Sequence, residues 1–398
     1  MVTFVFSNPR HHLEAMVPVA RLLRERGVPV RFVSLAELRG FPTPSLAERL
    51  PGADIRRAIP RHVRRDPSAG AGVGTRGGPG ALLRKVARAA TWHAGLRPRL
   101  WWLLRGTRVV VVPNDAAYPY ADLAADLRLR RVPFVLLQEG IRFPLPAEDA
   151  AGLPYGKGGA TAVCAWGEAS AEHFRAIGVP AAAVHVTGTP RYDAVSPAAW
   201  RERGRALAAE LGLPREPLLY LSNTIDDQGF CTTAAKLELF ARFVREAAPV
   251  LARERRALVV KLHPREDTAA FRRVADGVLD AHVPIHVLPL DAPLFAVLAM
   301  GKAAVVLAST VGLEALAFGL PLGVLAIPGH GHVFEYVARG AALGLTPGDV
   351  AGGVERLLAA EAPAPAAAPF LERHLAHRGQ AAVRIADRIA AVLTARSS

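Results

Sequence analysis

The chain has 398 residues and a mass of 42.3 kDa, which exceeds one ordinary domain core and predicts two domains. Hydrophobic residues make up 51% of the chain and charged residues 21%, so an intrinsically disordered or fibrous protein is excluded. The 49 Lys and Arg residues outnumber the 35 Asp and Glu residues, and the formal net charge is +14. An anionic partner and a compositional bias toward Arg both explain that excess.

Two cysteines, Cys164 and Cys231, lie far apart and form neither a disulfide framework nor a metal-binding cluster. Cys164 stands in an apolar run and is expected to be a small buried residue. The N-terminus, MVTFVFSNPRHH, shows no basic leader before a long apolar stretch, and no window of about 18 uncharged apolar residues occurs. We therefore expect a cytoplasmic protein without a signal peptide or a membrane-spanning helix.

Apolar runs alternate with helix-period segments through the first half of the chain. A run at residues 2–7 is followed by a helical pattern over 13–26, which Gly27 ends. Further strands are predicted over residues 30–34, 109–113, 134–138 and 161–165. Strands that are apolar throughout and separated by helices indicate a parallel sheet with helices on both faces.

The pattern restarts after a polar helix predicted over residues 196–211. The strands expected in the second half are residues 218–222, 257–262, 285–288, 303–307 and 322–326. The chain is therefore predicted to be an α/β protein with two Rossmann-like doubly wound domains, residues 1–195 and 196–369, and a closing helix over 370–398. Ligands of such sheets bind outside the carboxyl ends of the strands, so we expect the domains to face a central cleft.

One segment, residues 61–108, interrupts this alternation. It holds eleven cations against one acid, Asp66, and three tryptophans, Trp92, Trp101 and Trp102. A basic stretch with tryptophans suits an anionic acceptor or a peripheral contact with the inner face of a membrane. An Arg-coated insertion whose tryptophans pack on the sheet explains the same composition. Nucleic acid is disfavoured as a partner because no helix-turn-helix, zinc or RNA-binding motif occurs.

The sequence VVKLHPRE places Lys261 and His263 at or near the carboxyl end of a predicted buried strand. Cationic and imidazole donors at that edge suit a phosphate group. A His-Pro pair that only turns the chain is the structural alternative. A second segment, VTGTPRYD, lies at the predicted domain junction. Its candidate phosphate-binding residues are Gly188, Thr189 and Arg191.

A strand-to-helix segment, VVLASTVGLEA, follows the His-Pro strand about forty residues later. Ser309, Thr310 and the first amides of the predicted helix suit an anion. Glu314, about one turn inside the helix, suits two ribose hydroxyls. An ordinary helix cap accounts for one hydroxyl and the glutamate equally well.

The order VTGTPRYD, VVKLHPRE and LASTVGLEALAFGLP resembles the GT-B superfamily of nucleotide-sugar enzymes over roughly residues 2–350. Within it, Gln138-Glu139-Gly140 together with His263-Pro264 is similar to the QEG and HP motifs of capsule-polysaccharide transferases, including Kdo and sialic acid transferases. The resemblance implies that Glu139 acts in acid/base chemistry. It also implies that His263 and the hydroxyl pair at 309–310 bind the nucleotide phosphate, commonly that of CMP. A loop glutamate paired with Arg142 is the alternative role of Glu139.

Non-hydrolysing UDP-N-acetylglucosamine 2-epimerases share much of this pattern, including a Glu-Ala-Gly-Leu-Arg segment similar to residues 139–142 and a TG…D junction. Their Asp-Ser-Gly-Gly turn is replaced here by Ala308-Ser309-Thr310-Val311. Their late Thr-Glu-Arg-Pro-Glu stretch is not found near residues 327–330. These departures favour glycosyl transfer over epimerisation. CDP-glycerol polymerising transferases carry a similar HP element.

His11 and His12 follow the first predicted strand, where an imidazole suits deprotonation of an acceptor hydroxyl, and His12 is the preferred catalytic candidate. Asp115 and Arg142 follow other strands on the same acceptor side. A strand-end carboxylate in a partly dry cleft is expected to have a raised pKa, which would suit Glu139 to acid/base work near neutral pH. No spaced Asp-x-Asp accompanies these residues, so neither a metal nor a cofactor is expected.

The sequence thus predicts a metal-independent glycosyltransferase of the GT-B fold. Its donor would be a nucleotide sugar, with a CMP-linked sugar favoured over a UDP- or CDP-linked one, bound by the second domain. Its acceptor would be a glycan or a lipid-linked molecule over the first domain. The alternatives are a UDP-N-acetylglucosamine 2-epimerase, a CDP-glycerol-type transferase, and a non-catalytic nucleotide-binding module on the same fold.

Overall fold

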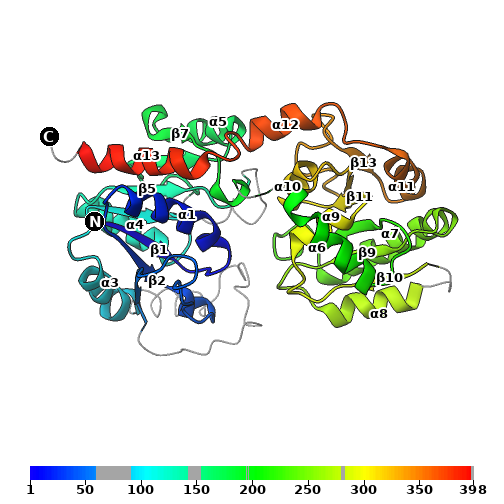
Figure 1. Ribbon diagram of the computed structural model, residues 1–398, viewed down its shortest axis with the longest axis horizontal. Coiled ribbons are helices and arrows are strands. Elements are labelled where there is room, and N and C mark those ends of the chain that lie inside the picture. Colours follow the sequence, from blue (N-terminus) through cyan, green and yellow to red (C-terminus); the bar gives the residue numbers. More distant parts are fainter. Residues whose placement is uncertain (60–90, 142–153, 194, 196, 279–282, 396–398) are drawn as a thin grey trace. The chain divides into compact units, whose positions relative to one another are not determined.

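The computed structural model describes residues 1–59, 91–141, 154–193, 195, 197–278 and 283–395. The chain divides into two compact units (Figure 1). Unit 1 comprises Met1–Arg142, Glu148–Ala194 and His374–Ser398, and unit 2 comprises Phe143–Ala147 and Val195–Arg373. The C-terminal segment therefore returns to the unit in which the chain begins.

Unit 1 is built on a parallel sheet with the strand order β3-β2-β1-β4-β5-β6-β7. Its strands are β1 (Val2–Phe6), β2 (Val30–Ser34), β3 (Asp54–Arg57), β4 (Val109–Val112), β5 (Phe134–Leu137), β6 (Ala162–Ala165) and β7 (Val184–Val186). Its helices are α1 (His11–Glu25), α3 (Arg97–Leu103), α4 (Tyr120–Leu129), α5 (Glu168–Ala176) and α13 (Ala381–Thr394), with short turns η1 (Ala36–Arg39), η2 (Thr91–Leu96), η3 (Ala181–Ala183) and η4 (Pro190–Tyr192).

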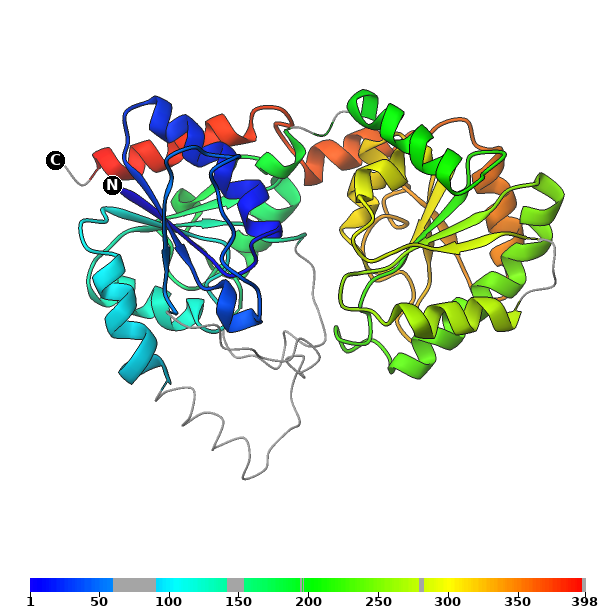
Figure 2. The same ribbon diagram turned by 60° about the horizontal axis from the view of Figure 1, so that its bottom comes forward.

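Both faces of this sheet are covered, which explains why its central strands are apolar throughout. The four residues of β4, VVVV, are all buried, and alternate residues contribute to two separate cores. Helices α1 and α13 close one core, and Figure 2 shows them on the same side of the sheet. Helices α3, α4 and α5 close the other.

Unit 2 repeats the architecture with the parallel strand order β10-β9-β8-β11-β12-β13. Its strands are β8 (Leu218–Leu221), β9 (Leu258–Lys261), β10 (Ile285–Val287), β11 (Ala303–Val306), β12 (Leu322–Leu325) and β13 (Leu343–Leu345). Its helices are α6 (Pro197–Glu210), α7 (Thr233–Glu254), α8 (Thr268–Val278), α9 (Leu294–Met300), α10 (Val311–Ala317), α11 (Val350–Ala359) and α12 (Ala367–His374). The prediction of two Rossmann-like doubly wound domains is confirmed.

Three edge strands of the two sheets were not predicted from the sequence. Strand β3 reads DIRR and is half exposed, and β7 and β13 each have three residues. Strand β3 has a single apolar residue, and three residues are too few for a strand pattern to stand out in β7 and β13.

The single closing helix predicted over 370–398 is wrong. Two helices, α12 and α13, occupy this region, and the chain between them includes His377 and Gly379 at positive φ, which interrupts a right-handed helix. Phe370 of α12 packs on Phe334 and Tyr336 in unit 2, whereas α13 packs in the core of unit 1.

The basic segment 61–108 is described only from residue 91 onward, so its first thirty residues lie outside the described residues. Within the remainder, Trp92 is buried in a core of unit 1 and Trp102 is exposed. Cys164 is buried in β6, as expected, and burial raises the pKa of its thiol to about 12. Among the residues that the structure describes, no helix combines the length and hydropathy needed to cross a bilayer.

Asp193 ties the returning helix α13 to unit 1. Its carboxylate accepts hydrogen bonds from the backbone N–H groups of Gly379, Ala381 and Ala382, at 2.8–3.0 Å. These donors lie at the start of α13, whose own N-cap residue, Gln380, supplies no side-chain bond. A negative charge there satisfies unpaired amides and complements the helix dipole.

We predict that Asp193→Ala lowers the free energy of unfolding by about 1–3 kcal/mol, because three amides lose a charged acceptor. Thermal unfolding followed by circular dichroism measures the effect. Asp193→Asn, which retains one acceptor oxygen, should lose less, and Asp276→Ala, at an exposed position, should lose almost nothing. Equal loss in all three variants would contradict the role of Asp193.

Candidate functional site

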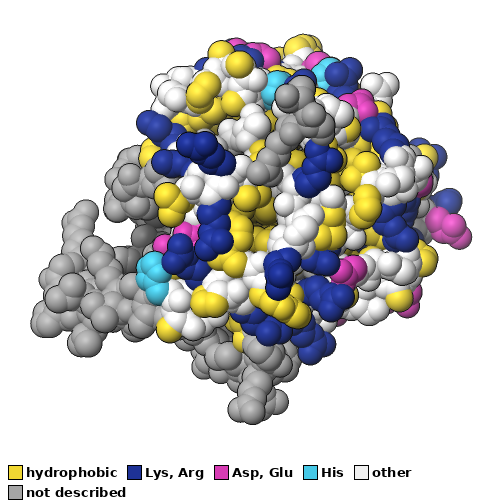
Figure 3. Space-filling view, turned by 90° about the vertical axis from the view of Figure 1, so that its left-hand side faces the viewer, with side chains coloured by type: hydrophobic (Ala, Val, Ile, Leu, Met, Phe, Trp, Pro, Cys, Tyr) yellow, Lys and Arg dark blue, Asp and Glu magenta, His cyan; other side chains and the backbone are white. Residues whose placement is uncertain are grey.

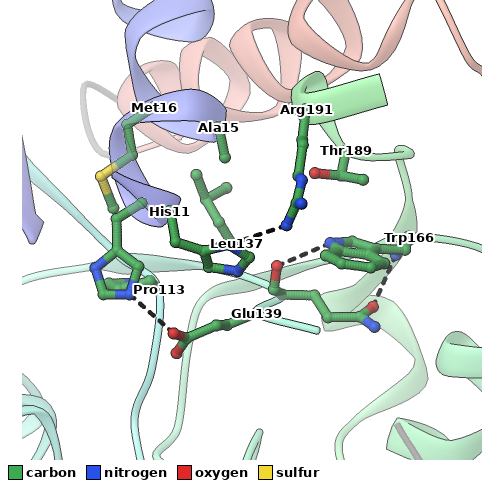
Figure 4. Close-up of a pocket in the computed structure, with 11 residues that line it drawn as sticks. His11, Ala15, Met16, Pro113, Leu137, Glu139, Trp166, Thr189 and Arg191 are labelled. Atoms are coloured by element: carbon green, nitrogen blue, oxygen red, sulfur yellow. Dashed lines mark hydrogen bonds and ion pairs between the residues drawn. The ribbon is translucent and has the colours of Figure 1, made fainter. Parts of the chain in front are cut away.

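Polar side chains gather at the carboxyl edge of the unit 1 sheet. The order of the strands reverses between β1 and β4, and this switch point is where open α/β sheets bind ligands. A pocket lies there, formed by the start of α1, the ends of β4, β5 and β6, and the segment at η4 (Figure 4). It is lined by His11, His12, Ala15, Met16, Pro113, Leu137, Gln138, Glu139, Trp166, Thr189 and Arg191.

His12 and Glu139, the two catalytic candidates, are in direct contact in this pocket. His12 Nε2 lies 2.9 Å from Glu139 Oε1, although the residues are 127 positions apart. The other ring nitrogen, Nδ1, accepts from the backbone N–H groups of Ser7 and Asn8 at 3.2 and 3.3 Å. The proton therefore resides on Nε2, which donates to the carboxylate.

The charge state of Glu139 differs from the expectation. Burial by itself favours the neutral acid, but His12, through electrostatic attraction and its hydrogen bond, favours the carboxylate. With further contributions from His11 and Arg39, the balance lowers the pKa of Glu139 to about 2. The predicted raised pKa is wrong, because the partner is an imidazole held against one oxygen. Glu139 is thus an ionised carboxylate at neutral pH, with no proton to donate, and its side chain is 25% exposed.

Tyr155 holds the backbone of Glu139. Its hydroxyl accepts from the Glu139 N–H at 2.8 Å and donates to the carbonyl of Pro113 at 3.0 Å. The segment after Tyr155 is anchored by Asp115, whose oxygens accept from the N–H groups of Gly156 and Gly158 at 2.8 and 2.7 Å. Asp115 is fully buried, so the structure gives this acceptor-side candidate an anchoring position.

Gln138 braces the same turn. Its amide nitrogen donates to the Gly140 carbonyl and to Ser170 Oγ, and its oxygen accepts from the Trp166 N–H, at 2.7–2.9 Å. Gly140 adopts a φ of +74°, which an L side chain rarely tolerates. In the QEG triplet, Gln138 therefore holds the loop through hydrogen bonds, Glu139 supplies the carboxylate and Gly140 allows the turn. Arg142, the alternative partner of Glu139, lies outside the described residues.

Residues assigned to the domain junction belong to this pocket. Arg191 Nη1 donates to His11 Nδ1 at 3.1 Å, and Thr189 lines the pocket beside it. Gly188 serves packing instead, because a Cβ at that position would lie 2.3 Å from the carbonyl oxygen of Ala376. The donor-binding role expected of these three residues stays a prediction.

The His-Pro strand ends at the carboxyl edge of the unit 2 sheet. Burial and then the charges of Arg265, Lys261 and Lys236 lower the pKa of His263 to about 4, against the opposing effect of Asp227. The imidazole is therefore neutral at pH 7. Its Nδ1 accepts from the Arg265 N–H at 3.2 Å, which leaves the proton on Nε2.

Lys261, by contrast, is buried, and its ammonium donates to the carbonyls of Leu262 and Leu290 at 3.0 and 2.9 Å. This geometry gives Lys261 a bracing position at the strand end. The role of phosphate ligand expected for it stays a prediction, as does that of His263.

The hydroxyl segment after β11 is an N-terminal turn. Ser309 Oγ accepts from the Val311 N–H at 3.2 Å, while Thr310 is partly exposed. Glu314 is fully buried, near Tyr336, and its expected role toward ribose hydroxyls stays a prediction. The ends of β8 and β11 are joined by Asn223 Nδ2, which donates to the Ala308 carbonyl at 2.8 Å.

Sequence reasoning missed Tyr155, Gln138 and Trp166 as supports of the pocket. Tyr155 lies in a connection with no motif, and nothing in the sequence indicates that its hydroxyl meets the end of β5. Within the described ranges, no group of three His, Cys, Asp or Glu side chains is arranged to hold a metal ion.

No protein-family model and no curated protein matches the chain. Solved structures do match. The S. aureus MnaA–UDP co-structure is 16% identical with a TM-score of 0.64, covering 99% of this chain and 96% of that one. UDP-GlcNAc 2-epimerase from Neisseria meningitidis bound to UDP-GlcNAc is 15% identical with a TM-score of 0.61, covering 98% and 99%. The wall teichoic acid polymerase TagF is 12% identical with a TM-score of 0.58, covering 100% and 90%.

At these identities the likeness establishes the fold and leaves the reaction open. The chain has the GT-B fold, as predicted. The specific resemblance to capsule transferases and the cleft expected between the domains stay predictions.

The lowered pKa of Glu139 predicts a pH dependence of stability. Its carboxylate contributes stability that is complete above the ordinary pKa of 4.5 and is lost as the pH falls through the folded-state pKa of about 2. Glu139→Gln should therefore destabilise the protein more at pH 6.5 than at pH 3.5. Melting temperatures of both proteins at both pH values test this. An equal difference at the two pH values would contradict the ionised pair.

Proposed function

We propose that this protein is an enzyme that acts on a nucleotide sugar, with Glu139 as its base. The observation that carries this proposal is the His12–Glu139 pair, because it places an ionised carboxylate, oriented by an imidazole, in a pocket at the ligand-binding edge of the sheet, where it can accept a proton. Support also comes from neighbours of the same fold that hold UDP or UDP-GlcNAc.

Unit 2 is proposed to bind the nucleotide. A neutral His263 with its proton on Nε2 is a hydrogen-bond donor toward a phosphate or sugar oxygen, at the edge where such sheets bind ligands. Arg265 follows two residues later and contributes positive charge, with its Nη2 donating to Thr224 Oγ1 at 3.1 Å. No cofactor or metal ion enters this scheme.

We take 2-epimerisation of a UDP-linked amino sugar as the first candidate reaction. It is supported by the N. meningitidis UDP-GlcNAc 2-epimerase, which shares the architecture over nearly the full length of both chains. In that reaction Glu139 would take the proton from C2 of the sugar as the C1–O bond to UDP breaks, and donors in unit 2 would stabilise the departing diphosphate. UDP would then add back to C1 of the resulting glycal while a proton returns to the opposite face of C2, which gives the 2-epimer. UDP therefore replaces CMP as the first nucleotide to test.

Glycosyl transfer is the second candidate reaction. The QEG and HP motifs, the Ala308–Val311 segment in place of an Asp-Ser-Gly-Gly turn, and the likeness to TagF support it. Here Glu139 would deprotonate a hydroxyl of the glycan or lipid-linked acceptor. A CMP-linked donor belongs to this version of the proposal.

An incubation in heavy water distinguishes epimerisation from glycosyl transfer. We expect UDP-N-acetylglucosamine, incubated with the protein alone in D₂O, to exchange its C2 proton for deuterium and to form the manno isomer, both visible by ¹H NMR. An unchanged C2 proton together with sugar transfer to an added acceptor would establish the second reaction. Failure of UDP, CMP, CDP, GDP and their sugars to raise the melting temperature would contradict the proposal as a whole.

Glu139→Gln should lower turnover by a factor of about 10²–10⁴, because the base is lost while the side-chain volume is kept. Nucleotide affinity, measured by calorimetry, should stay within about twofold, since Glu139 belongs to unit 1. Glu168→Gln, at an exposed position on α5, is the control and should keep full activity. Normal turnover by the folded Glu139 variant would remove this residue from the mechanism.

His263→Ala should weaken nucleotide binding by about 1–3 kcal/mol, the range for losing a hydrogen bond to a charged group. Because the imidazole is neutral at pH 7, nucleotide affinity should also change little between pH 6 and pH 8. His286→Ala, on strand β10 of the same sheet, is the control. Unchanged affinity in the His263 variant would place the phosphate elsewhere.

A further inference from the structure

A second concavity lies at the opposite edge of the unit 1 sheet from Glu139. It is formed at the amino ends of β5 and β6, beside β7 and the last turns of α4 and α13. Its lining includes three arginines, Arg128, Arg131 and Arg388, and His185. Strand β5 has four residues, so the two sites are separated by roughly 10–15 Å of sheet.

The guanidinium groups of the three arginines are not engaged in polar contacts within the described part of the chain. None of these side chains makes a hydrogen bond or an ion pair there, in contrast to those of Arg26, Arg31 and Arg97, which pair with carboxylates. Burial and then the charge of Arg388 lower the pKa of His185, so this imidazole is a neutral donor. The concavity therefore presents positive charge and side-chain hydrogen-bond donors that have no acceptor among the described residues, which suits phosphate oxygens.

Exposed apolar side chains also occur on α3 and α4. Leu129, next to Arg128, is 76% exposed, and Trp102 on α3 is 56% exposed. Helices α3 and α4 meet here, because Trp101 donates to Asp126 at 3.1 Å and the Arg130 guanidinium lies 4.0 Å from the centre of the Trp101 ring. Aromatic and leucine side chains surrounded by arginine are the composition of a surface that enters a lipid headgroup layer.

The charge distribution at this end of unit 1 is one-sided. Figure 3 shows dark blue Lys and Arg side chains spread between yellow apolar ones, with few magenta carboxylates. The nearby carboxylates are engaged: Asp126 with Arg97 and Trp101, and Asp387 with Arg26. Positive charge therefore predominates on the described part of this face.

We propose that this face, defined by Trp102, Leu129, Arg128, Arg131 and Arg388, docks unit 1 on an anionic phospholipid bilayer. The arginines bind lipid phosphates, and the two apolar side chains enter the interface. The pocket of Glu139 lies at the other edge of the sheet and stays clear of the membrane. The membrane contact expected of residues 61–108 is thereby assigned to described residues of α3, α4 and α13.

The test is flotation with vesicles of phosphatidylcholine alone or with 30% phosphatidylglycerol, using the full-length protein. We expect binding only to the anionic vesicles, and weaker binding at 0.5 M than at 0.05 M salt. Substituting all three arginines by Gln should weaken binding about 100-fold, at about fivefold for each charge near the surface. Trp102→Ala with Leu129→Ala should weaken binding even at low salt.

A matched control removes three exposed arginines from unit 2, by Arg201→Gln, Arg205→Gln and Arg273→Gln. It should bind as wild type, with circular dichroism confirming that both triple variants fold. Equal loss in the control would reduce the effect to net charge and overturn the proposal. So would absence of binding to anionic vesicles. A third outcome would also overturn the proposal, in favour of a nucleic-acid surface. In that outcome the wild-type protein binds a single-stranded RNA oligomer but no vesicles, and the variant that lacks Arg128, Arg131 and Arg388 loses its affinity for the RNA.

Discussion

The hydrogen bond between His12 and Glu139 is the contact on which the proposed chemistry depends. It joins the first turn of α1 to the end of β5 and engages the imidazole from both sides, because Nδ1 accepts from the Ser7 and Asn8 amides. That arrangement fixes the tautomer and keeps the carboxylate ionised. A base that is already charged and oriented requires little reorganisation when substrate arrives.

Buried polar side chains hold the loops around that pair. Asp115 and Asp193 accept backbone N–H groups from segments distant in sequence, and Gln138 makes three hydrogen bonds with its single amide. The backbone N–H and C=O groups of loops at the edge of a sheet make no hydrogen bonds to neighbouring strands. Burying such groups without a hydrogen-bond partner destabilises the folded protein. The QEG triplet therefore combines chemistry with support, because only its glutamate faces the pocket as a reactive group.

In both units a histidine carries its proton on Nε2, but the surroundings of that donor differ. In unit 1, His12 faces a carboxylate and donates to it, whereas in unit 2 His263 is surrounded by Arg265, Lys261 and Lys236 and loses its charge. The same side chain thus orients a base in one unit and presents a neutral donor in the other. Under the proposed function, Glu139 serves proton transfer and His263 serves the binding of the leaving group.

The sequence by itself determined the fold class, since buried strands and amphipathic helices are local patterns that a single chain reveals. It also indicated Glu139, His12 and His263, because strand ends in parallel sheets converge on one edge. Only the tertiary structure decided that His12 meets Glu139, that Asp115 and Glu314 are buried, and that the pKa of Glu139 falls rather than rises. Charge states and hydrogen-bond partners depend on distances between residues far apart in the chain, and sequence spacing does not contain those distances.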